Sequence, residues 1–352
     1  MKDAASFDKA LRVEATVERD GMRFYDIEQD PFSIHGVFRD GDHFRRIPKA
    51  VSETVSEAVD WLGNNTAGGR VRFVTDSARV AIIAELWALG KMPHFALTGS
   101  VGFDVYADDG SGDRYAGSLI PPFDIENRLE AMTWLGKPAE RVVTVNFPLY
   151  SGVKRVLIGV EDTATIKAAP RFSDERPVVF YGSSITQGGC ASRPGNSYQA
   201  ILARRLGFDY QNLGFSGSAK AEDTMIDYLA SLPMRAFVMD YDHNAPDVAH
   251  LEKTHEPLYK AVRKAHPDIP IVMMTRPGYR YNDEELERLA IMMRTYERAV
   301  AAGDTAVYVI DGRELFGEEF AEVATVDGCH PNDAGFFAMA RRMEPLMKEI
   351  LA

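Results

Sequence analysis

Cysteine is scarce in this chain of 352 residues, and its two thiols, Cys190 and Cys329, are too few for a disulfide framework. Long apolar runs are missing as well. No stretch is long enough to span a bilayer, and the amino terminus carries acidic residues where a signal peptide would have an apolar segment. We therefore expect a cytoplasmic protein that does not act at a membrane.

An excess of positive charge is also lacking. The chain has 40 Lys and Arg against 52 Asp and Glu, a formal net charge of -12. Nucleic-acid affinity comes largely from basic side chains that replace phosphate counterions, so a nucleic acid is not the expected partner. A small-molecule substrate fits better. There is no internal repeat or low-complexity segment, and 45% hydrophobic residues are enough for a folded protein.

The length exceeds the size at which single cores usually stop growing, so two domains are expected. Short β-like patterns dominate residues 1–168 and predict an all-β sandwich or jelly roll. A helix is predicted over 49–63, where Val51, Val55, Val59 and Leu62 recur at helical spacing. The predicted strands are 69–76, 78–87, 102–108, 140–149 and 154–161.

A stretch with Pro170 and Pro177 and no clear period predicts a linker, after which β and α patterns alternate through residues 175–352. One predicted helix covers 197–207, with Ser197 as its cap and Gly207 as its terminator. Apolar strands alternating with helices indicate a parallel sheet covered on both faces, an α/β/α domain. The predicted strands are 177–182, 208–214, 235–241, 269–277 and 306–312.

Ligands of such sheets bind outside the carboxyl ends of the strands, so the residues that follow the strands are the place to look. Ser183 and Ser184 follow the first of them in the segment GSSITQGG. A serine hydroxyl is a weak nucleophile unless a neighbouring base takes its proton. Taken alone, the segment is explained equally well by the preference of Ser and Gly for turns.

Two later strand ends could supply donors for a developing oxyanion. Gly217 lacks a Cβ and can bring its backbone N–H close to a substrate, and Asn244 carries a side-chain NH2. Near the carboxyl terminus, Asp327 and His330 are three residues apart. This spacing lets the carboxylate bind one imidazole nitrogen while the other faces outward, as a general base requires. A cap network at a helix start is the alternative reading of this pair.

In their order along the chain these segments resemble the SGNH/GDSL hydrolases. Gly182, Ser183 and Ser184 match the first block, Gly217 the second, Asn244 the third, and Asp327 with His330 the fifth. Ser183 stands where the family usually has aspartate, which creates a second candidate hydroxyl. Ser184 is the expected nucleophile, because Ser184, Ile185 and Thr186 keep the register of the family.

The residues within these blocks resemble those of a subgroup of GDSL-like acylhydrolases. Members of this subgroup have an amino-terminal β domain with a Gly-x-Asp-Leu-Tyr signature. Gly102, Asp104 and Tyr106 match that signature, with Val105 for leucine. The alternative is that Asp104 and Tyr106 simply pack the β domain.

The resemblance implies a flavodoxin-like α/β domain and a serine esterase with the triad Ser184, His330 and Asp327. Its oxyanion hole would combine the Ser184 and Gly217 N–H groups with the Asn244 side chain, and no metal or organic cofactor is implied. Acetylated oligosaccharides are the expected substrates; a lipase, thioesterase or acyltransferase, or an inert carbohydrate-binding protein, are the alternatives. Assembly into a homo-oligomer stays open. The residues near strand ends that could bind a polar substrate are Arg193, Tyr198, His243, Arg276 and Tyr279.

Overall fold

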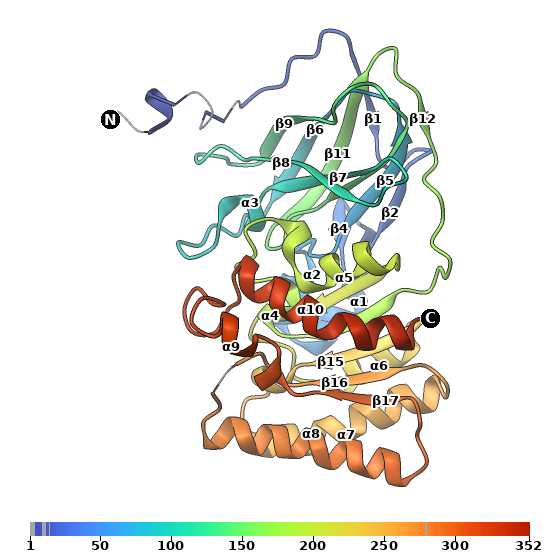
Figure 1. Ribbon diagram of the computed structural model, residues 1–352, viewed down its shortest axis with the longest axis vertical. Helices are drawn as coiled ribbons and strands as arrows, with labels where there is room; N and C mark the ends of the chain where they lie inside the picture. The colour runs from blue at the N-terminus through green and yellow to red at the C-terminus, as the bar shows by residue number, and fades with distance from the viewer. Residues whose placement is uncertain (1–3, 9–11, 14, 279) are drawn as a thin grey trace.

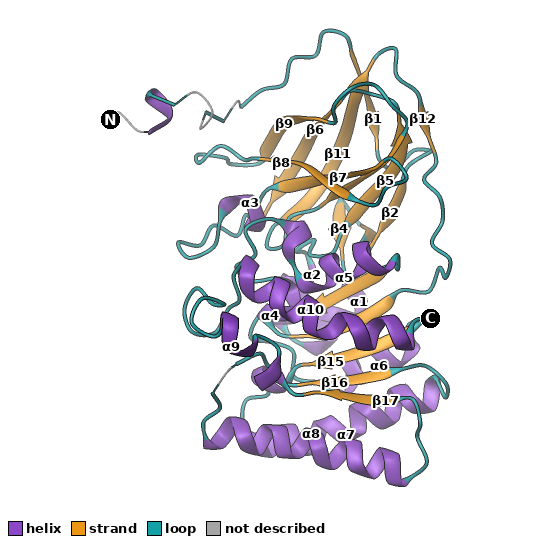
Figure 2. Ribbon diagram, in the orientation of Figure 1, coloured by secondary structure: helices purple, strands orange, loops and turns teal. Residues whose placement is uncertain are grey.

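The computed structural model describes residues 4–8, 12–13, 15–278 and 280–352. A β-rich amino-terminal region stands above a carboxyl-terminal domain in which helices flank a parallel sheet (Figure 1). The colouring by secondary structure in Figure 2 separates the two regions, because nearly all the long helices belong to the second. The predicted fold class is thereby confirmed. No described helix is long and apolar enough to cross a membrane.

Two antiparallel sheets form the amino-terminal sandwich. One has the strand order β1-β11-β6-β9, and the other β12-β5-β10-β7-β8, with β2 also paired to β5. Inward side chains from both sheets, such as Phe73 and Ile82, are fully buried in one apolar core. The strands are β1 (Met22–Asp26), β2 (Ser33–His35), β5 (Arg70–Thr75), β6 (Arg79–Trp87), β7 (Phe103–Asp108), β8 (Arg114–Leu119), β9 (Arg128–Trp134), β10 (Arg141–Asn146), β11 (Gly152–Glu161) and β12 (Ile166–Lys167).

All five strands predicted for this region are present, as β5, β6, β7, β10 and β11. The first helix differs from the prediction, because it is broken at Ser56 into α1 (Lys49–Val55) and α2 (Glu57–Gly63). Ser56 has an extended backbone, and its hydroxyl accepts the N–H of Val59, so one residue ends α1 and caps α2. Between β6 and β7 lies one further turn of helix, α3 (Leu97–Ser100).

The carboxyl-terminal sheet is fully parallel with the order β14-β13-β15-β16-β17, the flavodoxin-like order. Its strands coincide with the five predicted runs, and Gly207 ends α5 with a left-handed φ of 70°. Ser197 makes no side-chain cap, contrary to expectation. The elements are β13 (Val178–Gly182), α4 (Ser184–Gln187), α5 (Tyr198–Leu206), β14 (Tyr210–Gly214), α6 (Asp223–Ser231), β15 (Ala236–Asp240), α7 (Val248–Ala265), β16 (Ile271–Met274), α8 (Asp283–Ala301), β17 (Val307–Ile310), α9 (Gly317–Phe320) and α10 (Asp333–Ile350).

Alternate residues of the central strand point to opposite faces of this sheet. Val178 and Phe180 join a core with α5 and α10, whereas Val179 and Tyr181 join a core with α6, α7 and α8. Figure 1 shows α10 on one side of the sheet and α7 with α8 on the other. Both faces are thus covered, which is why every residue of β13 is buried and its sequence reads as a continuous apolar run.

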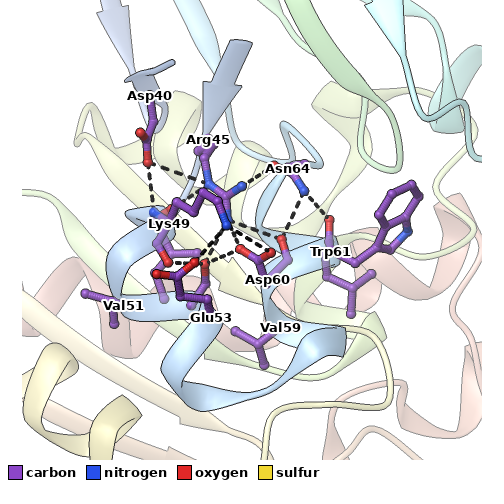
Figure 3. Close-up of polar contacts among 12 residues, drawn as sticks. Asp40, Arg45, Lys49, Val51, Glu53, Val59, Asp60, Trp61 and Asn64 are labelled. Atoms are coloured by element: carbon purple, nitrogen blue, oxygen red, sulfur yellow. Dashed lines mark hydrogen bonds and ion pairs between the residues drawn. The ribbon is translucent and has the colours of Figure 1, made fainter. Parts of the chain in front are cut away.

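The helical pair α1–α2 belongs in space to the carboxyl-terminal domain, although it lies within the predicted β domain. Val59 is fully buried in the same apolar core as residues of α6 and of the parallel sheet. In Figure 3 the side chain of Arg45, from the short hairpin of β3 (Phe38–Asp40) and β4 (His43–Arg45), lies over both helices. Its guanidinium donates to Ser52 Oγ at 2.8 Å and to Asp60 Oδ1 at 2.6 Å. This ion pair joins the two helices to the hairpin.

Arg46 joins the two regions, and its side chain is completely buried. Its guanidinium donates to the carbonyls of Leu62 and Asn65 beside it and to those of Asn212 and Gly214 in the parallel sheet, at 2.7–3.0 Å. Burial lowers the pKa of Arg46 to about 9. Because a buried charge is tolerated only when its donors are paired, these four carbonyls hold the regions in one arrangement.

Candidate active site

The loop that follows β13 places Ser184 at the carboxyl edge of the sheet, as the first residue of α4. Two glycines let the chain turn so sharply. A Cβ at Gly182 would lie 2.2 Å from the Asp240 carbonyl oxygen, and a Cβ at Gly214 would lie 2.1 Å from the backbone nitrogen of Gln187. Real Cβ atoms do not approach so closely, so only glycine allows α4 to lie directly against β14 and β15.

The two neighbouring serines have different hydrogen-bond partners. The Ser183 hydroxyl caps α4 by accepting the N–H of Ile185 at 3.1 Å. The Ser184 hydroxyl instead lies 2.9 Å from His330 Nε2. Only Ser184 is therefore within proton-transfer distance of a histidine, and Ser183 has a structural task in place of the family's aspartate.

His330 and Asp327 lie in the loop before α10, and they complete a chain of hydrogen bonds. His330 Nδ1 lies 2.8 Å from Asp327 Oδ2, while Nε2 faces Ser184. Asp327 Oδ1 accepts the N–H groups of Cys329 at 3.0 Å and His330 at 2.7 Å. The carboxylate thus orients both the imidazole and the loop that carries it, which is the arrangement of a serine–histidine–aspartate triad.

The charge of Asp327 is secured by these contacts. Partial burial raises its pKa, but hydrogen bonds from the His330 ring and from the amides of His330 and Cys329 outweigh burial and lower the pKa to about 2. The carboxylate is ionised at neutral pH. An ionised partner accepts the Nδ1–H and leaves the Nε2 lone pair free to take a proton from Ser184.

Three donors lie at the strand ends around Ser184. Among the described residues, the N–H groups of Ser184 and Gly217 have no hydrogen-bond acceptor. Gly217 adopts a left-handed φ of 66°, and a Cβ there would meet nothing within 4 Å, so its backbone conformation is the reason for glycine. Asn244 Oδ1 accepts the Ala219 N–H at 3.4 Å, which turns its NH2 group away from that turn. These three groups can serve as oxyanion donors.

Gln187 connects the serine turn with the glycine turn. Its side-chain oxygen accepts the N–H of Ser216 at 3.1 Å, and its NH2 donates to Asn65 Oδ1 and to the Leu149 carbonyl at 3.0 and 3.2 Å. Gln187 is fully buried, so these bonds are shielded from water. The candidate donors on two separate loops are thereby fixed relative to each other.

The β region also reaches the site, which the sequence did not indicate. The Tyr150 hydroxyl donates to the Ser184 carbonyl at 3.3 Å, and the ring of His94, from the loop between β6 and α3, lies 6.1 Å from the ring of His330. Nothing in the segment KMPHFAL around His94 distinguishes this residue from an ordinary loop histidine. Its position depends on how the two regions pack.

Two of the five residues predicted to bind substrate are engaged elsewhere. Tyr198 is fully buried in the core, where its hydroxyl lies 3.3 Å from Asp240 Oδ2, so the prediction of substrate contact is wrong for this residue. Arg193 donates to Asp104 at 3.1 Å and to the Tyr106 hydroxyl, and it joins the two regions. The error for Tyr198 arises because position after a strand does not reveal which way a side chain points, whereas substrate contact by Arg193 stays a prediction.

His243 and Arg276 do lie beside the triad. His243 Nε2 is 3.4 Å from the Cys329 thiol, one residue from His330. Burial and the charges of Arg276 and Arg288 lower the pKa of His243 to about 4, so it is neutral at pH 7. Tyr279 lies outside the described residues.

The signature residues Asp104 and Tyr106 bind the carboxyl-terminal domain. Asp104 is fully buried; it accepts the Gly195 N–H at 2.9 Å and the Asn146 side chain at 2.8 Å, besides Arg193. Burial raises its pKa, although these donors oppose the shift. The pair therefore does more than pack the β domain: it holds the turn that follows Cys190.

Three residues at the site could hold a metal ion. Ligand atoms of His94, Cys190 and His330 all lie within 4.8 Å of one another, the one such group found in the described part of the chain. The ring of another histidine, His255, is buried away from this group and hydrogen-bonded to Thr295.

The fold and this hydrogen-bonded serine define a class, the GDSL-like hydrolases. The model of the GDSL-like Lipase/Acylhydrolase family matches residues 175–348, and that of the N-terminus of SGNH-hydrolase-type esterases matches residues 22–166. The chain belongs to the SGNH/GDSL hydrolases that carry an amino-terminal Gly-x-Asp-Leu-Tyr domain. A comparison with curated proteins found no match.

Several solved structures share the whole arrangement. A structure described as a GDSL-like lipase from Bacteroides ovatus is 27% identical, with a TM-score of 0.84, over 94% of this chain and 98% of that one. A salicylyl-acyltransferase from a tetracycline biosynthetic pathway is 18% identical with a TM-score of 0.77, over 94% and 99%. An acetyl xylan esterase from Butyrivibrio proteoclasticus is 15% identical with a TM-score of 0.55, over 93% and 98%. At these identities, the last two comparisons show that the fold is shared.

Proposed function

We propose that the protein is a serine esterase that removes short acyl groups, acetyl above all, from carbohydrates through an acyl-enzyme. The observation that carries the proposal is the hydrogen-bonded chain Ser184–His330–Asp327, flanked by two backbone N–H groups that have no acceptor among the described residues and by the Asn244 amide. Membership of an ester-hydrolase family supports the same reaction.

In the proposed cycle, His330 Nε2 takes the Ser184 proton as Oγ attacks the ester carbonyl. The negative charge that develops on the carbonyl oxygen is stabilised by the N–H groups of Ser184 and Gly217 and by the Asn244 NH2. His330 then gives its proton to the leaving alcohol. Water, activated by the same imidazole, releases the acid and restores Ser184.

The preference for a carbohydrate ester rests on two supports. The acetyl xylan esterase shares the two-region fold over nearly its whole length. In addition, polar side chains border the triad, since His94, His243 and Arg276 approach it from three loops. A polar alcohol fits such surroundings better than a long acyl chain does.

The test uses p-nitrophenyl esters of increasing chain length and acetylated xylo-oligosaccharides, with released acid as the readout. We expect acetyl to be preferred, and an optimum at long chains would contradict the proposal. A fluorophosphonate should label Ser184, and Ser184→Ala should abolish both labelling and hydrolysis. Ser183→Ala is the matched control: it removes a neighbouring hydroxyl and a helix cap worth about 1 kcal/mol, but it should keep the activity.

Acyl transfer to an alcohol is a second candidate, because the salicylyl-acyltransferase shares the fold more closely than the acetyl xylan esterase does, with TM-scores of 0.77 and 0.55. The same acyl-enzyme would serve both reactions. The two reactions differ in whether water or a sugar accepts the acyl group. If the enzyme, given p-nitrophenyl acetate and a free oligosaccharide, forms more acetylated oligosaccharide than acetate, it is a transferase.

A further inference from the structure

His94, Cys190 and His330 form a cluster that the proposed esterase cycle does not use as a group. Their ligand atoms all lie within 4.8 Å of one another, and they come from three separate segments. His94 belongs to the loop after β6 in the amino-terminal region, Cys190 follows α4, and His330 precedes α10. The cluster exists only because the two regions pack against each other.

We propose that these three side chains bind a zinc ion. Because the ion takes up the Nε2 lone pair of the catalytic histidine, it reversibly inhibits the enzyme. Two imidazole nitrogens and one thiolate are ligands that zinc prefers, and they leave a fourth position for water or a substrate atom. Binding of the ion does not depend on the proposed function. Only the inhibition does.

The orientation of His330 suits a zinc ligand. Its Nδ1–H is held by the Asp327 carboxylate at 2.8 Å, which leaves the lone pair of Nε2 outward. A carboxylate that accepts the second ring N–H of a ligating histidine is the usual support of zinc sites, where it fixes the tautomer and raises the basicity of the ligand. The contact that makes His330 a general base therefore makes it a metal ligand as well.

Cys190 is held in an unusual backbone conformation beside this histidine. Its φ is 77°, a left-handed value that is strained for a residue other than glycine. The preceding turn is fixed by the Gly189 N–H, which donates to the Ser184 carbonyl at 2.8 Å. A Cβ at Gly189 would lie 2.9 Å from the Tyr150 hydroxyl, so any residue larger than glycine at this position would displace the turn. The thiol thus occupies a constrained position next to the triad.

The three donors need only a small movement to close on an ion. In a tetrahedral site with Zn–N near 2.0 Å and Zn–S near 2.3 Å, ligand atoms are about 3.3–3.6 Å apart. His94 is exposed and has no hydrogen bond among the residues described, so its side chain can rotate to supply the difference of about 1 Å. On binding, the Cys190 thiol releases its proton to solvent as the Zn–S bond forms, and Ser184 loses its base as Nε2 binds the ion.

A second cysteine–histidine pair lies nearby and provides the matched control. Cys329 and His243 are 3.4 Å apart, but the charges of Arg276 and Arg288 act on His243 and oppose a cation there. Zinc should therefore select Cys190 over Cys329.

The experiment titrates the full chain with Co²⁺, a spectroscopic substitute for Zn²⁺, and follows the cobalt–thiolate charge-transfer band. We expect a band that Zn²⁺ displaces, that disappears in Cys190→Ser and that persists in Cys329→Ser. His94→Ala, a change at an exposed loop position, should weaken Co²⁺ binding at least about 100-fold. Loss of the band in Cys329→Ser, its persistence in Cys190→Ser, or undiminished affinity in His94→Ala would each overturn the proposal.

Inhibition is measured separately with the best ester. Zn²⁺ should inhibit the wild type, a chelator should restore it, and zinc should inhibit Cys190→Ser far less, each activity being compared with that of the same variant without metal. Equal inhibition of both proteins would contradict inhibition through this site. Ser184→Ala should retain the cobalt band, because Ser184 is not a ligand. Should no ester be hydrolysed, the esterase proposal fails while the cobalt titration still decides on the metal site.

Discussion

Replacing Asp327 by asparagine should reverse the tautomer of His330 while leaving the loop in place. In the wild type, Asp327 Oδ1 accepts two backbone N–H groups and Oδ2 accepts the Nδ1–H of the ring. An asparagine oxygen can keep the two backbone bonds. Its NH2 group would then face Nδ1, which must accept, so the ring proton moves to Nε2.

A proton on Nε2 prevents His330 from accepting the proton of Ser184, whose hydroxyl lies 2.9 Å away. Asparagine in the equivalent place of other triads slows turnover about 10,000-fold. At about 1.36 kcal/mol for each factor of ten, this corresponds to about 5.4 kcal/mol of lost transition-state stabilisation. Because Asp327 is exposed and its backbone contacts persist, the free energy of unfolding should change by less than about 1 kcal/mol.

The assay compares kcat for p-nitrophenyl acetate in wild type and Asp327→Asn, with urea unfolding of both. Asp311→Asn is the control, because Asp311 follows β17, the last strand, at the same sheet edge but binds Arg313. Full activity in Asp327→Asn would remove Asp327 from the mechanism. An equal loss in Asp311→Asn would show that the effect is a general one of charge at this edge.

Three further predictions concern the donors, the interface and pH. Asn244→Ala should lower kcat by about 100- to 1000-fold with little change in KM; an unchanged kcat would exclude Asn244 as an oxyanion donor. Asp104→Ala should lower the free energy of unfolding in urea by about 3–5 kcal/mol, because it leaves Arg193 without its buried partner; a loss below 1 kcal/mol would refute this. Burial lowers the pKa of His255 to about 4 from 6.5, so the unfolded chain binds more protons, and stability should fall by up to about 1.4 kcal/mol per pH unit from about pH 6.5 to 4. His255→Gln should lose that part of the pH dependence. If urea unfolding gave the same change in the free energy of unfolding between pH 7 and pH 5 for wild type and His255→Gln, the prediction would be wrong.

Local sequence patterns predict most of the fold. Each strand of the parallel sheet is an apolar run bounded by turn residues, and Gly207 ends α5 as its conformational freedom predicts. The break at Ser56 was missed, because valines at 51, 55 and 59 keep helical spacing across it. Periodicity reports which face is buried, and a capping hydroxyl can divide a helix without changing that face.

The order of the motifs along the chain was enough to nominate Ser184, Gly217, Asn244, Asp327 and His330, since the carboxyl ends of parallel strands meet at one edge. Sequence could not choose between Ser183 and Ser184 by chemistry. That choice depends on which hydroxyl meets Nε2 and which caps α4, and it is made by side-chain direction in three dimensions.

What the sequence determined by itself is therefore the two-region architecture, the parallel sheet and the segments that gather at its edge, because hydrophobic period and turn chemistry are local properties. Only the tertiary structure decided that Tyr198 is buried, that Arg193 joins Asp104, and that His94 lies beside His330. These contacts connect residues 89 to 236 positions apart in the chain. No local pattern encodes such distances, since they follow from how one packed region meets the other.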